Sequence, residues 1–172
     1  MKAVLDTSPF QALHRADVLD EVRRLFHGGV FVPESVEVQT FGARRLGRDI
    51  VPDMDDLPWI EVLPVSPDES GALESAPPPG RRGLRRKPSC GGFVLDREEF
   101  DVIVLARRLG AVAVLDDHQG LRCATNLGVR SATTLEVMAS LVQARLIGVN
   151  EARLGIEQIE ATGYFPTRRR SR

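Results

Sequence analysis

Blocks of apolar and polar residues alternate along the chain, and the blocks have the lengths of short strands and of helices. Short apolar runs predict five buried strands, over residues 3–5, 30–33, 59–65, 111–117 and 129–134. A helix is expected to begin near Pro9, and helical spacing of apolar residues predicts others over 16–26, 34–47, 96–110, 119–128, 135–147 and 149–163. This alternation favours an α/β fold in which helices cover both faces of a parallel sheet.

The chain has the length of one domain that is interrupted once. Its 172 residues are enough to bury a substantial core, and the domain is expected to span residues 1–165. Residues 66–92 are dense in Pro, Gly, Ser and charge, so we predict an insertion without regular structure there. Residues 166–172 form a basic tail.

Composition narrows the class of protein further. No apolar run reaches the roughly 20 residues that a membrane span needs, and no signal-peptide pattern is present. The two cysteines, Cys90 and Cys123, lack the spacing of metal-binding motifs, which argues against a disulfide scaffold and against a structural zinc site. We therefore expect a cytoplasmic protein that makes no membrane contact.

Two of the predicted strands end in aspartate. Asp6 follows the first strand, and Asp116 with Asp117 closes the fourth. In doubly wound sheets, ligands bind outside the carboxyl ends of the strands, where the strand order reverses. If the first and fourth strands are neighbours, these three carboxylates converge at one edge of the sheet.

One further acid is expected at the same edge. Glu99 lies in the first turn of the helix predicted over 96–110, on the same stripe as Ile103 and Ala106. Asp101 lies in that turn as well, about 200° round from Glu99, so its position is less favourable.

Several carboxylates at one edge repel one another unless they are protonated, separated by water or shared with a cation. Oxygen ligands select hard ions, so the pattern predicts Mg²⁺ or Mn²⁺. Such an ion suits phosphodiester hydrolysis, because it activates a bound water and neutralises charge on the phosphate. Each acid also has a structural interpretation: Asp6 and Asp117 suit helix N-caps, and Glu99 favours a helix N-terminus.

Basic residues are segregated from the acids. The net charge is −1, but five cations gather within residues 81–87, namely Arg81, Arg82, Arg85, Arg86 and Lys87. Four arginines of the tail add to them, and the remainder of the chain is therefore acidic. An acidic body with two basic strips indicates that a polyanion binds close to carboxylates. A bound cation would offset the repulsion between the polyanion and these carboxylates. Nucleic-acid contact by these strips and simple solvation of basic loops are both open.

Three stretches together resemble a PIN domain, most closely the PIN-like proteins related to VapC-type toxins. They are "VLDTS", "LDREEFDVIVLARRLGAVAVLDDHQGLRCATNLGV" and "TTLEVMASLVQARLI". The likeness covers most of the chain apart from residues 66–92 and the tail. It implies a three-layer α/β/α sandwich with a mostly parallel five-stranded sheet. It also implies Mg²⁺- or Mn²⁺-dependent cleavage of single-stranded RNA, often by a toxin that an antitoxin protein neutralises.

The resemblance assigns site residues by position. Asp6, Glu99 and Asp117 match metal-binding carboxylates of the family, and Asp116 lies beside the last of them. Thr7 matches the small hydroxyl residue that often follows the first acid. These residues are expected to hold one ion, with Asp116 and Asp101 assisting, and residues 81–87 or the tail to bind RNA phosphates.

The chain departs from the family pattern in three places. Gln39 stands where the family usually has a second acid, and its neutral amide is a poorer metal ligand. Glu98 replaces the usual glycine before Glu99, and Thr133-Thr134 replaces the usual Gly-Thr after the fifth strand. Thr134 is counted with Thr7 and Gln39 among the residues that support the site.

Three functions are weighed on this basis. The first is a metal-dependent endoribonuclease, and the second is a non-catalytic member of the same fold that binds RNA or a protein partner, which Gln39 favours. The third is a phosphoacceptor receiver or an aspartyl-nucleophile phosphatase. The third is disfavoured, because the acidic pair follows the fourth strand and residue 8 is serine.

Other nucleotide-binding and hydrolytic classes are excluded by the lack of P-loop, dinucleotide-binding and serine-hydrolase motifs. The closing helices form either a homodimer face or part of the core, through their apolar residues Leu135, Met138, Leu141 and Leu146.

Overall fold

A parallel sheet lies at the centre of the fold. The computed structural model describes residues 1–45, 56–71, 73, 89–90 and 93–164. Within these ranges a five-stranded sheet runs in the order β3-β2-β1-β6-β7. Its strands are β1 (Ala3–Leu5), β2 (Val30–Pro33), β3 (Ile60–Leu63), β6 (Val112–Val114) and β7 (Ser131–Ala132). All four pairings in this sheet are parallel, so the predicted five-stranded α/β fold is confirmed.

The strand order reverses between β1 and β6. From β1 the chain builds β2 and β3 on one side, then crosses to build β6 and β7 on the other. Ala3 pairs with Val112 and Leu5 pairs with Val114, so the two strands end level with each other. The first and fourth strands of the sheet are therefore neighbours, as the prediction of a shared acidic edge required.

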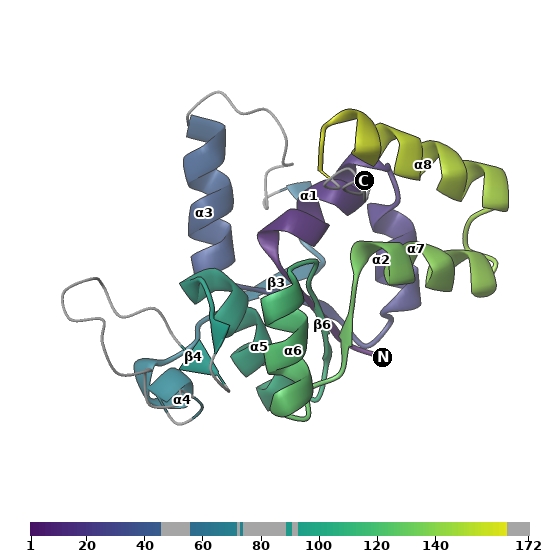
Figure 1. Ribbon diagram of the computed structural model, residues 1–172. Helices are drawn as coiled ribbons and strands as arrows, with labels where there is room; N and C mark the ends of the chain where they lie inside the picture. Colours follow the sequence, from purple (N-terminus) through teal and green to yellow (C-terminus); the bar gives the residue numbers. More distant parts are fainter. Residues whose placement is uncertain (46–55, 72, 74–88, 91–92, 165–172) are drawn as a thin grey trace, which may run out of the picture.

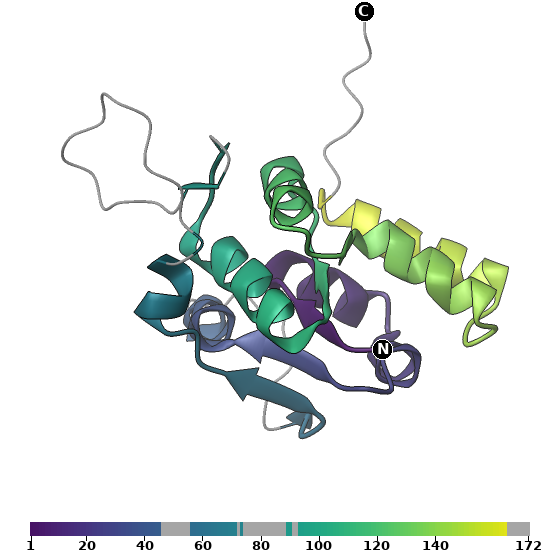
Figure 2. The ribbon, with the colours of Figure 1, turned by 90° about the horizontal axis from the view of Figure 1, so that it is seen from below.

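Helices cover both faces of the sheet and make a three-layer α/β/α sandwich (Figures 1 and 2). On one face α5 contacts β1, β2 and β6, and α4 and α6 pack beside it. In the other layer α1, α2, α7 and α8 pack on one another, and α3 contacts both α1 and α5. The helices are α1 (Thr7–Arg15), α2 (Leu19–Leu25), α3 (Glu34–Arg45), α4 (Pro67–Gly71), α5 (Arg97–Leu109), α6 (His118–Asn126), α7 (Thr134–Gln143) and α8 (Val149–Ala161).

The first turn of α5 is held in place by burial of the rest of the helix. Val102, Ile103, Leu105 and Ala106 are fully buried, on the apolar stripe that the sequence predicts. The helix ends at Gly110, whose φ of 61° lies in the left-handed region that favours glycine. This packing sets the beginning of α5 at the carboxyl edge of the sheet.

The prediction of an insertion without regular structure over 66–92 is wrong at both of its ends. Ser66 and Glu69 form a reciprocal cap for α4: the Glu69 N–H donates to Ser66 Oγ at 3.2 Å, and the Ser66 N–H donates to Glu69 Oε2 at 2.9 Å. Arg108 of α5 donates to Glu69 Oε1 at 2.9 Å and fixes α4. At the other end β4 (Ser89–Cys90) pairs antiparallel with β5 (Phe93–Val94). The basic strip at 81–87 and the tail at 166–172 lie outside the described residues.

The two cysteines meet in the fold. Cys90 of β4 and Cys123 of α6 form a disulfide across 33 residues of sequence, with their Cα atoms 5.6 Å apart. The cysteine spacing argued against a disulfide scaffold and gave no sign of this single bridge, which forms because β4 pairs with β5 and β5 packs against α6. Cys123 is buried, as expected for a core residue.

The closing helices α7 and α8 lie side by side (Figures 1 and 2). Met138 and Leu141 are buried and complete the core, whereas Leu135 is 45% exposed. None of the helices in the described part of the chain is long and apolar enough to cross a membrane.

Candidate active site

Asp6 stands at the first residue after β1, in the N-cap position of α1. Its side chain makes no hydrogen bond of full capping geometry, and the nearby backbone N–H groups of Thr7 and Ser8 stabilise its charge only in part. Burial raises its pKa from 3.8 to about 6; the backbone N–H groups of Thr7 and Ser8 oppose this shift, and the negative charges of Asp116 and Glu98 add to it. A buried carboxylate in such surroundings is unfavourable unless a proton or a cation accompanies it.

Glu99 approaches Asp6 from the first turn of α5. Its Oε2 accepts a hydrogen bond from the backbone N–H of Asp96 at 3.3 Å, which holds it at the start of the helix. The pKa of Glu99 is raised to about 7, mainly by burial and in addition by the negative charges of Asp6 and Asp117. The negative charges of Asp6, after β1, and of Asp117, after β6, therefore both act on Glu99.

Asp117 is the N-cap of α6. Its Oδ1 accepts hydrogen bonds from the backbone N–H groups of Gln119 at 2.7 Å and Gly120 at 3.2 Å. Asp117 is therefore a helix N-cap, as its structural interpretation states. Its negative charge also raises the pKa of Glu99. One carboxylate oxygen caps the helix, and the residue as a whole remains exposed at the edge.

Asp116 is held by three hydrogen bonds. Its Oδ1 accepts the backbone N–H of Thr134 at 2.8 Å, and its Oδ2 accepts the Thr134 hydroxyl at 2.6 Å and the Tyr164 hydroxyl at 2.5 Å. Burial raises the pKa of the Tyr164 hydroxyl, and its hydrogen bond to Asp116 adds to the shift. Asp116 thus joins the end of β6 to the start of α7, and Thr134 supports the site through it. Tyr164 was missed, because nothing in the local sequence links it to residue 116.

Thr7 and Gln39 are joined directly. The Thr7 hydroxyl donates to Gln39 Oε1 at 2.5 Å, across 32 residues of sequence. Gln39 therefore lies beside the first acid, and its amide oxygen accepts this hydrogen bond. Its NH₂ group can donate to a ligand.

These residues line an acidic cleft of about 300 Å³. The cleft contains predicted residues from α1, α3 and α5, and it also contains four that sequence reasoning did not assign to the site. The full lining is Asp6, Thr7, Ser8, Gln11, Gln39, Asp96, Glu98 and Glu99. Glu98 was noted only as a departure from the family glycine, and its charge acts on Asp6.

Asp101 is not part of this cleft. It is buried on another side of α5, where its Oδ1 lies 3.0 Å from Arg97 Nε and accepts a hydrogen bond from the Ser70 hydroxyl at 3.4 Å. The prediction that Asp101 assists the site is corrected by this contact with α4. The angle of about 200° from Glu99 is the physical reason.

The donor set of the cleft suits a hard divalent cation. Its acids are all oxygen ligands, and burial, with a smaller contribution from neighbouring negative charges, raises the pKa values of Asp6 and Glu99. As placed, no three acidic, histidine or cysteine side chains of the described residues converge closely enough to hold an ion. Glu98 and Glu99 are half-buried, and Asp117 is exposed.

The fold and the cleft define a doubly wound α/β protein with carboxylates where the strand order reverses. A family model for the PIN domain matches residues 2–170, and the chain belongs to the PIN-domain family, whose members are generally nucleases. Among solved structures it is similar to a PilT N-terminus domain protein from the hyperthermophilic archaeon Sulfolobus solfataricus P2. The two are 20% identical with a TM-score of 0.50, over 83% of this chain and 94% of that chain. This likeness supports the fold alone, and no curated protein gave a match.

Proposed function

We propose that the protein is a metal-dependent endoribonuclease that hydrolyses phosphodiester bonds of single-stranded RNA. The observation that carries the proposal is the opposition of Asp6 and Glu99 in the acidic cleft, where each carboxylate has a raised pKa. A shared cation would relieve both. Membership in a family of nucleases supports hydrolysis of a nucleic acid as the reaction class.

Asp6, Glu99 and Asp117 are the residues that would hold Mg²⁺ or Mn²⁺, with Asp116 beside them. Such an ion, when bound, lowers the pKa of a coordinated water and neutralises charge on the phosphate. Asp116 is a positioning residue, because its hydrogen bonds to Thr134 and Tyr164 fix the chain that carries Asp117.

Gln39 fits this site as a hydrogen-bond donor. Because Thr7 already donates to its oxygen, the Gln39 NH₂ group can donate to a phosphate oxygen of the RNA at the wall of the cleft. Glu98, which lines the same cleft, brings a carboxylate to a site in which position 39 lacks one.

We propose further interactions and a cellular location for the protein in addition to its binding of single-stranded RNA. Contact of residues 81–87 with RNA phosphates, neutralisation by an antitoxin protein, homodimer formation and a cytoplasmic location are proposals that follow from the resemblance and from the charge pattern. The biological role that corresponds to these proposals is that of the toxin in a toxin–antitoxin pair.

A second candidate is a catalytically degenerate module that binds RNA or a protein partner. Gln39 in place of an acid favours it, as does the lack of a closely converged ligand set among the described residues. The two candidates differ in their response to metal, because a binding module would keep its RNA affinity in EDTA and leave the RNA uncut.

The test is cleavage of an end-labelled single-stranded RNA by the purified protein with Mn²⁺, Mg²⁺ or EDTA. Asp6→Asn and Asp117→Asn should abolish metal-dependent cutting. Asp68→Asn, an exposed acid of α4, serves as the control and should leave it unchanged. Cutting that persists in EDTA, or equally in Asp6→Asn, would contradict the proposal. Mn²⁺ binding by electron paramagnetic resonance on the same samples separates an unsuitable RNA from a site that binds no metal.

A further inference from the structure

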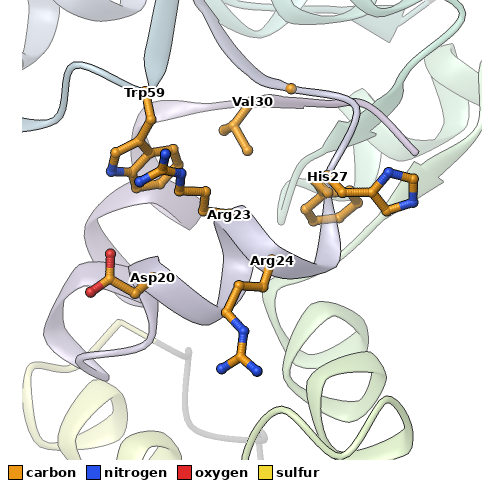
Figure 3. Close-up of a pocket in the computed structure, with 8 residues that line it drawn as sticks. Asp20, Arg23, Arg24, His27, Val30 and Trp59 are labelled. Carbon is orange, nitrogen blue, oxygen red and sulfur yellow. The ribbon is translucent and has the colours of Figure 1, made fainter.

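A second cavity, of about 620 Å³, lies between α2 and the beginnings of β2 and β3 (Figure 3). Val30 is the first residue of β2, and Trp59 immediately precedes β3. Asp6, by contrast, follows the carboxyl end of β1. The cavity therefore opens at the edge of the sheet opposite the acidic cleft, about 13 Å away along a strand of four residues. Its volume lies in the range of small-molecule sites.

The inner surface of this cavity is apolar and partly aromatic. Val30 and Phe26 are buried at 2% and 3% exposure, and half-buried Trp59 forms one side. Gly29 completes the lining with bare backbone: its φ is 120°, and a Cβ there would lie 2.8 Å from the ring of Phe31. This position therefore excludes a side chain, because the ring of Phe31 occupies the space a Cβ would need.

The rim of the cavity is cationic. Arg23 lies across the Trp59 indole, with its guanidinium carbon 5.8 Å from the ring centroid (Figure 3). Arg24 is exposed and reaches Glu21 only at 3.9 Å, the limit of an ion pair. Asp20 is the one carboxylate among the described lining residues, so the two arginines exceed it in charge.

We propose that this cavity binds a nucleotide of single-stranded RNA, with the base stacked on Trp59 and Arg23 and the phosphate near Arg24. The identity of the ligand rests on the proposed function, but binding does not require cleavage. A flat aromatic face suits any base, and an arginine plane adds to the stack. The phosphate of the nucleotide would be bound by an exposed cation beside the aromatic face, which Arg24 provides. An acidic peptide would bind the two arginines but would not stack on the ring of Trp59.

Trp59 provides the measurement, because it is the only tryptophan of the chain and lies in the cavity itself. Its fluorescence would be titrated with a 12-nucleotide single-stranded oligoadenylate and with adenosine monophosphate. The Asp6→Asn protein in EDTA is used so that no cutting occurs. Saturable quenching by both ligands is expected, since stacking on an indole changes its emission.

The charge of the rim is tested with matched double variants. Arg23→Gln with Arg24→Gln should weaken oligoadenylate binding by about 5- to 100-fold, as expected for loss of a stacked cation and a phosphate contact. Arg107→Gln with Arg153→Gln makes the same change in net charge on the exposed surfaces of α5 and α8 and should retain the affinity. Circular dichroism melts of both proteins check that α2 remains folded.

Several results would overturn the proposal. These are a lack of saturable quenching, equal weakening in the two double variants, or equal binding of polyglutamate or inorganic phosphate. Equal binding of polyglutamate would assign the cavity to acidic proteins. Because the titration contains neither metal nor an intact Asp6, its failure is independent of the cleavage assay. RNA that is cut without quenching Trp59 would leave the proposed function intact and remove this site.

Discussion

The Thr7 hydroxyl donates a hydrogen bond to Gln39 Oε1 at 2.5 Å. This contact joins the residue after the first buried aspartate to α3, and it fixes the amide that stands where a PIN domain usually has an acid. The substitution is therefore accommodated by the neighbouring hydroxyl, and the glutamine is oriented in the cleft.

Gln39→Glu should increase the affinity for Mn²⁺. The variant places a further carboxylate beside Asp6. The Thr7 hydroxyl can donate a hydrogen bond to this carboxylate as it does to the amide. We expect a gain of about tenfold by electron paramagnetic resonance titration, since ligand charge tunes the affinity of oxygen sites. Gln143→Glu, on the exposed surface of α7, is the control. Equal affinity in both variants would show that position 39 does not face the ion.

Asp6→Asn should stabilise the metal-free protein at neutral and alkaline pH. The pKa of Asp6 is about 6 in the fold and 3.8 as an ordinary value, so the folded state binds the proton more tightly. Stability of the wild type therefore falls as pH rises from about 4 to about 6 and stays lower above that range. Asparagine does not ionise, so the Asp6→Asn protein does not lose stability in this way as the pH rises.

Urea unfolding in EDTA measures this effect. Asp6→Asn should be about 3 kcal/mol more stable than the wild type at pH 8, from a shift of about two pKa units, and nearly equal to it at pH 4. Asp68→Asn should show no such dependence. A difference of the same size at both pH values would mean that burial does not destabilise the ionised form of Asp6.

Tyr164→Phe should destabilise the protein by about 2 kcal/mol. The change removes one of three donors to Asp116, and hydrogen bonds to charged groups contribute more than neutral ones. Thermal unfolding of the single variants and of Tyr164→Phe with Asp116→Asn forms a double-mutant cycle. The loss should be smaller in the Asp116→Asn background, and strict additivity would indicate that the two side chains do not interact.

Reduction of the disulfide between Cys90 and Cys123 should lower the free energy of unfolding by about 3 kcal/mol. The bridge closes a loop of 33 residues, and that length sets the entropy it removes from the unfolded chain. Urea unfolding with and without dithiothreitol measures the difference. Cys90→Ser should be insensitive to the reductant, and a wild type that is equally insensitive would show that the bridge does not form.

Much of the fold could be predicted from the sequence, because local pattern decides it. The apolar runs that become β1 and β6 are short and end in aspartate, and the α5 stripe has clear helical period. Parallel pairing then places Asp6 and Asp117 at one edge by topology alone. Glu99 follows from the angle between it and Ile103 on the helix.

The remaining parts of the site depend on tertiary contacts that no local pattern announces. Tyr164 reaches Asp116 across 48 residues, and Thr7 reaches Gln39 across 32. The start of α4 carries a capping signal at Ser66 and Glu69, but the surrounding Pro, Gly and charge obscured it. Asp101 illustrates the opposite case, since its contacts with Arg97 and Ser70 give an acid near the site a structural role.

The register of Ala3 with Val112 has a consequence for biosynthesis. β1 leaves the ribosome well before β6, because this one of its two neighbours is more than a hundred residues later in the chain. Pairing of segments so distant in sequence is slow compared with local folding. Asp6 and Asp117 therefore cannot meet until β6 has been synthesised, and the nascent chain carries its carboxylates separated before that point. If these acids cut RNA, the ribosome and its message are protected from the nascent chain until residue 117 has left the ribosome.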